Sequence, residues 1–252
     1  MNKLEFETDQ INIVFLGADC SASMEKEVYE MKKGLQEYKD KMIKFAKEEG
    51  MSIAICISKF NDSYYSGSFV EPDELDTRYY ASGGTAMYDA IHYGAKQLDK
   101  YMQEVIKINK VKPRATFIIF SDGESNSDSL NNYVNMAKSD IAMLNELGVT
   151  TAFVAFGSSV KSELGTNLGF QSTIDVNDRS VLERFLGVEL SKSTIEQSRS
   201  IHSLGSDFFS KATTGDEKSE KISNKSKVAI EDRKWLDNIF FNWVAYYINT
   251  LS

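Results

Sequence analysis

The stretch "INIVFLGADCSAS", residues 11–23, decides the fold, because a run of apolar residues ends there in an acid and two serines. Apolar side chains without alternation are typical of a strand that is buried on both faces of a sheet. Side chains alternate along an extended chain, so Asp19, Ser21 and Ser23 project to the same side. The stretch therefore predicts an inner strand whose carboxyl end gathers three oxygen-bearing side chains, as an oxygen-lined cation site requires.

The chain up to residue 200 alternates between short apolar runs and longer amphipathic patterns. Strands are expected at 52–60, 115–120, 149–157 and 172–176, with a short edge strand or hairpin arm at 63–70. Helices are expected at 24–49, 86–106, 127–148 and 178–200. Strands of this kind alternating with helices indicate an α/β fold: a doubly wound, mainly parallel open sheet with helices on both faces.

Three regions follow one another along the 252 residues. Residues 1–202 form the α/β domain, 203–230 read as a polar linker rich in Ser, Lys and Glu, and 231–252 as an aromatic-rich helix. The apolar face of that helix is too broad for a solvated surface helix. It either folds back onto its own domain or binds another chain, including a second copy by self-association, and both alternatives stay open.

Composition excludes several classes of partner. A formal net charge of −8 argues against nucleic acid and against a polybasic membrane-binding patch. No apolar stretch approaches the length of a bilayer span, and the N-terminus lacks the apolar core of a secretion signal. Because Cys20 and Cys56 are the two cysteines of the chain, no disulfide framework is indicated, and we expect a cytoplasmic protein.

Two further loops carry hard oxygen ligands. Thr85 lies in "SGGTAMYDAI" (82–91), and Asp122 lies in "FSDGES" (120–125), directly after a predicted strand. Ligands bind outside the carboxyl ends of the strands in open α/β sheets, so these side chains are expected near Asp19. Two carboxylates and three hydroxyls without a His or Cys cluster suit Mg²⁺, or else Mn²⁺ or Ca²⁺, better than Zn²⁺. Since the hydroxyls are neutral, an acidic side chain from another protein could complete the shell.

These residues resemble the metal-ion-dependent adhesion site (MIDAS) of von Willebrand factor type A (VWA) domains. "DCSAS" at 19–23 is similar to the DxSxS motif, Thr85 to the isolated threonine and Asp122 to the later aspartate. The stretches "GGTAMYDAI", "FSDGE" and "FND" (60–62) look especially like the stand-alone bacterial members, and the resemblance covers roughly residues 9–200. Ala22 departs from the pattern, since many members have Gly there.

The resemblance implies a VWA domain over residues 1–202 and a role for each motif residue. Asp19, Ser21 and Ser23 would bind the ion directly or through water, Thr85 would add a hydroxyl, and Asp122 a carboxylate. The implied function is that of a divalent-cation-dependent adaptor in a larger assembly, whose protein ligand donates an acidic side chain to the metal.

Two alternatives stay open: a metal-dependent hydrolase, most plausibly a phosphoesterase, and an accessory subunit of a chelatase or of a kinase/phosphatase system. The chain contains no G-x-S-x-G elbow and no phosphate-binding loop, and neither His92 nor His202 lies in a catalytic-triad context. We therefore do not expect an enzyme.

Overall fold

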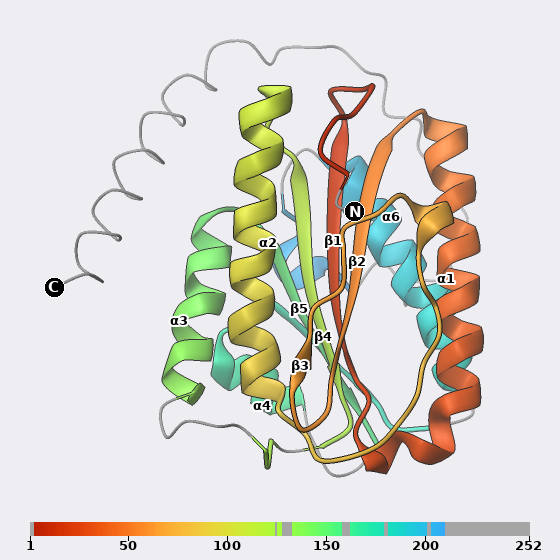
Figure 1. Ribbon diagram of the computed structural model, residues 1–252, viewed down its shortest axis with the longest axis vertical. Helices are drawn as coiled ribbons and strands as arrows, with labels where there is room; N and C mark the ends of the chain where they lie inside the picture. The colour runs from red at the N-terminus through yellow and green to blue at the C-terminus, as the bar shows by residue number, and fades with distance from the viewer. Residues whose placement is uncertain are drawn as a thin grey trace, which may run out of the picture. The chain divides into compact units, whose positions relative to one another are not determined.

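A six-stranded sheet forms the centre of the computed structural model, with strand order β3-β2-β1-β4-β5-β6 (Figure 1). The structure describes residues 3–123, 125–127, 133–157, 162–178, 181–200 and 203–209. The strands are β1 (Ile11–Asp19), β2 (Ser52–Phe60), β3 (Tyr64–Tyr65), β4 (Arg114–Ser121), β5 (Thr150–Phe156) and β6 (Ser172–Val176).

All neighbouring strands run parallel except β3, which pairs antiparallel with β2. β1 lies between β2 and β4, and all nine of its residues are buried, as its unbroken apolar sequence predicts. In register, Asp19 pairs with Phe60 of β2, and Ala18 pairs with Phe120 of β4. The carboxyl ends of these three strands therefore meet at one edge of the sheet.

Helices cover both faces of the sheet and confirm the doubly wound α/β fold (Figure 1). Alternate β1 residues divide between two cores: Ile13 and Phe15 pack with α2 and α3, whereas Val14 and Leu16 pack with α1 and the last helices. The helical elements are η1 (Ala22–Glu27), α1 (Val28–Glu49), η2 (Pro72–Glu74), α2 (Met87–Asn109), α3 (Tyr133–Glu146), α4 (Ser162–Leu168), α5 (Leu182–Arg184), η4 (Phe185–Leu190), α6 (Ser191–Arg199) and η5 (Gly205–Asp207).

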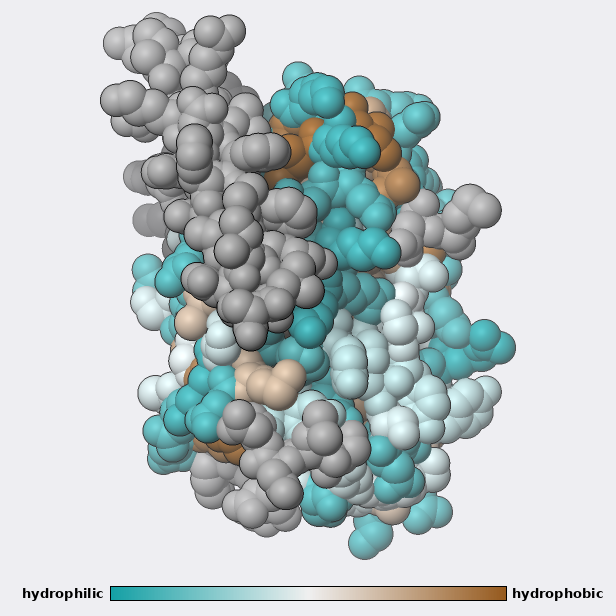
Figure 2. Space-filling model, turned by 60° about the vertical axis from the view of Figure 1, so that its left-hand side comes forward, coloured by the Kyte–Doolittle hydropathy of each residue, from teal (hydrophilic) through white to brown (hydrophobic). Residues whose placement is uncertain are grey.

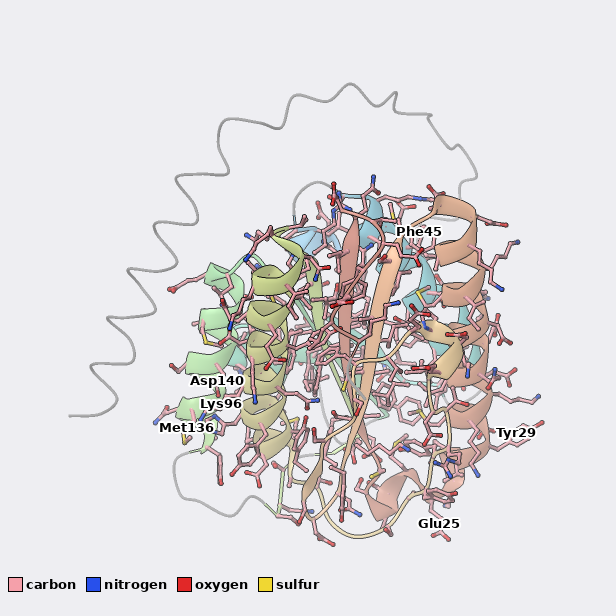
Figure 3. All side chains as sticks on the ribbon, turned by 45° about the horizontal axis from the view of Figure 1, so that its top comes forward. Glu25, Tyr29, Phe45, Lys96, Met136 and Asp140 are labelled. Carbon is pink, nitrogen blue, oxygen red and sulfur yellow. The ribbon has the colours of Figure 1, made fainter. Side chains whose placement is uncertain are left out.

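The outer surface on the side of α2 and α3 is largely hydrophilic or of intermediate hydropathy, with a hydrophobic area toward one end (Figure 2). This distribution is what amphipathic helices give when they bury one face against a sheet. Between the two helices, His92 Nδ1 lies 2.7 Å from Asp140 Oδ2, and both side chains are buried. Asp140 also lies close to Lys96 of α2 (Figure 3).

The predicted strand at 63–70 is shortened to the two residues of β3. Side chains bind the backbone of Gly67 in place of a neighbouring strand: Gly67 N donates to Ser58 Oγ (3.0 Å), and Gln97 Nε2 donates to Gly67 O (2.7 Å). A Cβ on Gly67 would lie 2.3 Å from Ile57 O, so this close approach requires glycine. The chain rejoins β2 only at the bridge between Val70 and Ile55.

The last helical region differs from the single helix predicted over 178–200, because the structure divides it into α5, the π-helix η4 and α6, from Leu182 to Arg199. Helix α4 was not predicted from the sequence. With seven residues, including the buried Gly165, it offers too short a stripe for periodicity to detect.

The described chain ends in buried aromatic residues. Phe208 and Phe209 pack into the core on the α1 side, with the Phe209 ring 6.1 Å from that of Phe185. The first seven residues of the predicted 203–230 linker thus belong to the packed domain. The rest of that linker and the predicted 231–252 helix lie outside the described residues. Among the described helices, none is long and apolar enough to cross a membrane.

Candidate metal centre

Asp19 is the buried end of β1, and hydrogen bonds fix both of its carboxylate oxygens. Its side chain is 0% exposed. The Ser21 amide donates to Asp19 Oδ1 at 2.9 Å, and the Ser121 hydroxyl donates to Asp19 Oδ2 at 2.7 Å. The carboxylate therefore has one fixed orientation at the carboxyl edge of the sheet.

Ser21, Ser23 and Asp122 meet beside it. Asp122 Oδ1 accepts hydrogen bonds from the Ser23 hydroxyl at 2.9 Å and from the Ser21 hydroxyl at 3.4 Å, and the two hydroxyl oxygens are 2.9 Å apart. Residues about 100 positions apart are thus brought together, because β4 pairs directly with β1. The oxygen atoms lie close enough together for a small cation to bind between them in place of these hydrogen bonds.

Thr85 lies on the adjoining loop between β3 and α2. It is almost fully buried, and its Oγ1 is 3.8 Å from the position that a Cβ on Gly123 would occupy, next to Asp122. This loop is also bonded to the Asp19 loop, since Ser82 N donates to Cys20 O (2.8 Å) and Ala22 N donates to Gly83 O (2.9 Å). All five predicted site residues therefore lie at the same edge of the sheet, Asp19 at the end of β1 and the other four in segments joined to it there.

Burial raises the pKa of both carboxyl groups. The pKa of Asp19 rises from 3.8 to about 6, because burial outweighs the hydrogen bonds from Ser21 and Ser121, and the charge of Asp122 adds to the increase. Burial likewise raises the pKa of Asp122, against the hydrogen bonds from Ser23 and Ser21. Two neighbouring acids that resist ionisation form a place where a divalent cation would relieve both desolvation and repulsion.

Sequence reasoning missed two residues that hold Asp19 in place. Ser121 precedes Asp122, and only the β1–β4 register brings its hydroxyl to Asp19. The buried Tyr79 donates its hydroxyl to the backbone carbonyl of Asp19. Neither contact has a local sequence signal, since the partners are 102 and 60 residues apart.

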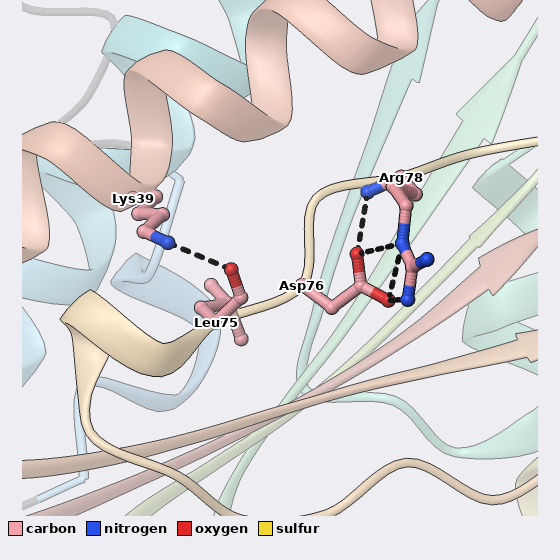
Figure 4. A network of polar contacts seen from close by, with 4 residues as sticks. All are labelled: Lys39, Leu75, Asp76 and Arg78. Carbon is pink, nitrogen blue, oxygen red and sulfur yellow. Dashed lines mark hydrogen bonds and ion pairs between the residues drawn. The ribbon is translucent and has the colours of Figure 1, made fainter.

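Residues 75–78, which lead to Tyr79, are bonded to α1 (Figure 4). Lys39 Nζ donates to Leu75 O at 2.9 Å. Three residues on, the Arg78 amide donates to Asp76 Oδ1 at 3.0 Å, and the Arg78 guanidinium binds both oxygens of the same carboxylate. These contacts fix the path of the chain just before Tyr79.

The donor set fits a hard cation and not a soft one. Two carboxylates with serine and threonine hydroxyls match the oxygen ligands of Mg²⁺, Mn²⁺ or Ca²⁺. In the part of the chain that the structure describes, no group of three or more His, Cys, Asp and Glu side chains is arranged to hold a metal ion. A cation here would therefore depend on the hydroxyls, on water and on a ligand from outside.

Two potentially reactive groups near these loops are engaged in structural contacts. Cys20 Sγ donates to Phe60 O at 3.1 Å, and burial raises the pKa of the thiol to about 11. The thiol is therefore protonated at neutral pH and a poor nucleophile. His92 is paired with Asp140 between α2 and α3.

Fold and site together define a doubly wound α/β domain with a hard-oxygen site at the carboxyl edge of its sheet. No protein-family model matches the chain, and no curated protein sequence matches it. Among solved structures, the pilus adhesin SpaC from Lactobacillus rhamnosus GG, in its open conformation, is similar with a TM-score of 0.56 and 14% identity. The similarity covers 77% of this chain and 31% of SpaC, so the chain spans about a third of that adhesin.

The minor pilin PilB from Streptococcus sanguinis is similar with a TM-score of 0.52 and 11% identity, over 77% of this chain and 63% of PilB. The ArnB paralog VWA2 from Sulfolobus acidocaldarius has a TM-score of 0.46 and 17% identity, over 71% of this chain and 45% of VWA2. At these identities the likeness to SpaC and PilB is one of fold.

Proposed function

We propose that the chain is a VWA-type domain that binds one divalent cation, Mg²⁺ in the first place, and uses it to bind a protein ligand. Asp19, Ser21, Ser23, Thr85 and Asp122 hold the ion, directly or through water. An acidic side chain of the ligand fills the remaining coordination position. The protein then serves as an adaptor within a larger assembly and not as an enzyme.

One observation carries this proposal: Asp122 Oδ1 accepts from both serine hydroxyls beside a buried Asp19. With Thr85 on the adjoining loop, these residues come from three segments in the order that the MIDAS motif has in VWA domains. Carboxylates that are costly to ionise would be neutralised by the ion, while neutral hydroxyls leave part of its charge for an external carboxylate. The adhesin SpaC, which shares the fold, supports a binding role by analogy alone.

Capture of protein ligands on the immobilised full chain tests this function. A ligand bound in Mg²⁺ should be released by chelator, and it should fail to bind Ser23→Ala, whose folded state can be checked by thermal unfolding. Ser63→Ala, a change of the same kind in a turn outside the proposed ligand set, should retain the ligand. Binding that is indifferent to chelator and to Ser23→Ala would contradict a cation-mediated interface.

A phosphoesterase is the competing function, and it makes the opposite prediction. The reading as an adaptor predicts no Mn²⁺-dependent hydrolysis of a generic phosphoester such as p-nitrophenyl phosphate above background. Turnover that is lost in Asp122→Ala would overturn the adaptor reading, because the same ion would then act as a Lewis acid.

A further inference from the structure

Asp62, in the turn after β2, is bonded to the glycine pair that precedes Thr85. Asp62 Oδ1 accepts from Gly84 N at 2.7 Å and from the Ser127 hydroxyl at 3.3 Å. The carboxylate lies directly against the pair: a Cβ on Gly83 would be 2.2 Å from Asp62 Oδ2, and one on Gly84 would be 2.9 Å from Asp62 Oδ1. Gly83 also has φ +77°, a backbone conformation that favours glycine, and Gly84 leaves room for the side chains of Asp62 and Ser127.

Asn126, in the loop after Asp122, forms two hydrogen bonds with the backbone of Thr85. The Thr85 amide donates to Asn126 Oδ1 at 2.8 Å, and the Asn126 amide donates to Thr85 O at 2.9 Å. The Ser125 hydroxyl adds a bond to Thr85 O (3.0 Å) and accepts from Met87 N at the start of α2 (2.9 Å). Both backbone polar groups of Thr85 are therefore held by the 125–127 segment.

We propose that Asp62 and Asn126 are positioning residues that preorganise Thr85 for the cation. The proposal rests on the proposed function and deepens it, since it says what sets the affinity of the same site. Two consecutive glycines lose much conformational freedom when they are ordered. Asp62 orders the pair and Asn126 fixes the backbone of Thr85 before the ion arrives, so the Thr85 hydroxyl is already at the edge shared with Asp122. Neither residue is itself a ligand; each acts through the backbone of residues 84 and 85.

Magnesium titration calorimetry on four variants of the full chain tests this role. Asp62→Ala and Asn126→Ala remove the acceptor oxygen, and each should weaken Mg²⁺ binding by about tenfold, as loss of one preorganising hydrogen bond would. Asp62→Asn and Asn126→Asp keep an oxygen in the accepting position. Both should stay within about threefold of the wild type, because the hydrogen bond and not the charge does the positioning.

Asp175→Ala is a matched control for Asp62→Ala. Asp175 is likewise an exposed carboxylate that accepts from one backbone amide, Ser162 N at 2.8 Å, and from one serine hydroxyl, Ser162 Oγ at 2.6 Å. It has no bond to the Thr85 loop, so its loss should leave Mg²⁺ affinity unchanged. Amide hydrogen exchange gives a second readout: Gly84 and Thr85 should exchange faster in Asp62→Ala and Asn126→Ala, and not in Asp175→Ala.

The outcomes distinguish failure of the positioning role from failure of the proposed function. Wild-type Mg²⁺ binding with unchanged affinity in both alanine variants contradicts the positioning role alone. An equal loss in Asp62→Asn and Asp62→Ala also contradicts it, since the charge would then be the cause. A wild-type protein that binds no Mg²⁺ contradicts the proposed function, and the positioning role falls with it.

Discussion

Burial of Asp19 makes its ionised form unfavourable for the fold. Its pKa is raised from 3.8 to about 6 in the folded state, mainly by burial. A group with a raised pKa contributes stability that is fully present below pH 3.8 and is lost as the pH rises through about 6. In the cation-free protein at neutral pH, the ionised carboxylate therefore opposes folding, by up to about 3 kcal/mol for a pKa difference of this size.

Asp19→Asn should consequently stabilise the cation-free protein at pH 7. The amide keeps an acceptor oxygen and has no charge to desolvate, so its free energy of unfolding should exceed that of the wild type by about 1–3 kcal/mol. Near pH 4 the two proteins should be nearly equal. Urea unfolding in chelator at both pH values measures the difference.

Added Mg²⁺ should reverse this order, because only the wild type gains binding free energy from the ion. The Asn variant should show no Mg²⁺-dependent increase in stability. A variant that is less stable than the wild type at pH 7 in chelator would contradict the electrostatic cost assigned to Asp19.

The sequence predicts the five candidate ligands better than it predicts the hydrogen bonds that hold them in place. Asp19, Ser21 and Ser23 follow from the period of a strand, Thr85 from its place after two glycines at a helix start, and Asp122 from its place directly after a strand. The contacts from Tyr79, Ser121 and Asn126 depend on strand register and on the path of loops, which no local pattern specifies. Binding of a metal by the five residues stays a prediction.

Helix α2 lies close against the sheet at Gly94. A Cβ on Gly94 would lie 2.5 Å from Phe15 Cζ and 3.3 Å from Phe117 Cε2. The rings of Phe15 and Phe117 stack on each other with centroids 4.9 Å apart, so neither is free to move aside. The helix position is thus set by a contact that only glycine allows.

Gly94→Ala should therefore destabilise the protein, although alanine favours helix by about 1 kcal/mol over glycine. Overpacking against the two rings should cost about 1–3 kcal/mol net in urea unfolding. Phe15→Leu provides room for the added methyl group. It should therefore lower the free energy of unfolding by less in the Gly94→Ala background than in the wild type. Strict additivity of the two changes would show that the steric conflict is absent.

At the same scale, the long elements and the short strand at 172–176 were predictable, whereas the length of β3 and the existence of α4 were not. The stripe through Met31, Leu35, Tyr38 and Met42 marks α1, and Gly50 with φ 64° ends it as expected. β3 and α4 have too few residues for a period to emerge. After β3, side chains of Ser58 and Gln97 bind the backbone of Gly67, and no local sequence pattern specifies these contacts.

For the whole molecule, the packed domain extends at least to Phe209. Ending the chain after Ser206 removes the buried Phe208 and Phe209, whereas ending it after Ala212 keeps both. The shorter chain should lose about 3 kcal/mol or more of unfolding free energy relative to the longer one, as loss of buried aromatic side chains does. Equal thermal stability of the two chains would contradict the role of these residues in the core.

The chain ending after Ala212 also separates the two proposals for the 231–252 helix. If that helix folds back, the truncated protein should unfold at a lower temperature than the full chain at every concentration. If it binds another chain, stability at low concentration should be equal, and a dimer or a partner complex should be lost, as light scattering or co-purification would show. A truncation that changes neither property would rule out both roles.

Titration calorimetry with Mg²⁺ on the wild type and on Asp122→Asn tests the cation site most directly. Asp122 Oδ1 is the oxygen to which both serine hydroxyls point, and the variant keeps its shape while removing its charge. Asp175→Asn serves as the matched control. The predicted result is one Mg²⁺ bound by the wild type and by the control, with affinity at least about tenfold weaker in Asp122→Asn. Equal binding by all three proteins, or no binding by the wild type, would contradict a divalent-cation site at the carboxyl edge of the sheet.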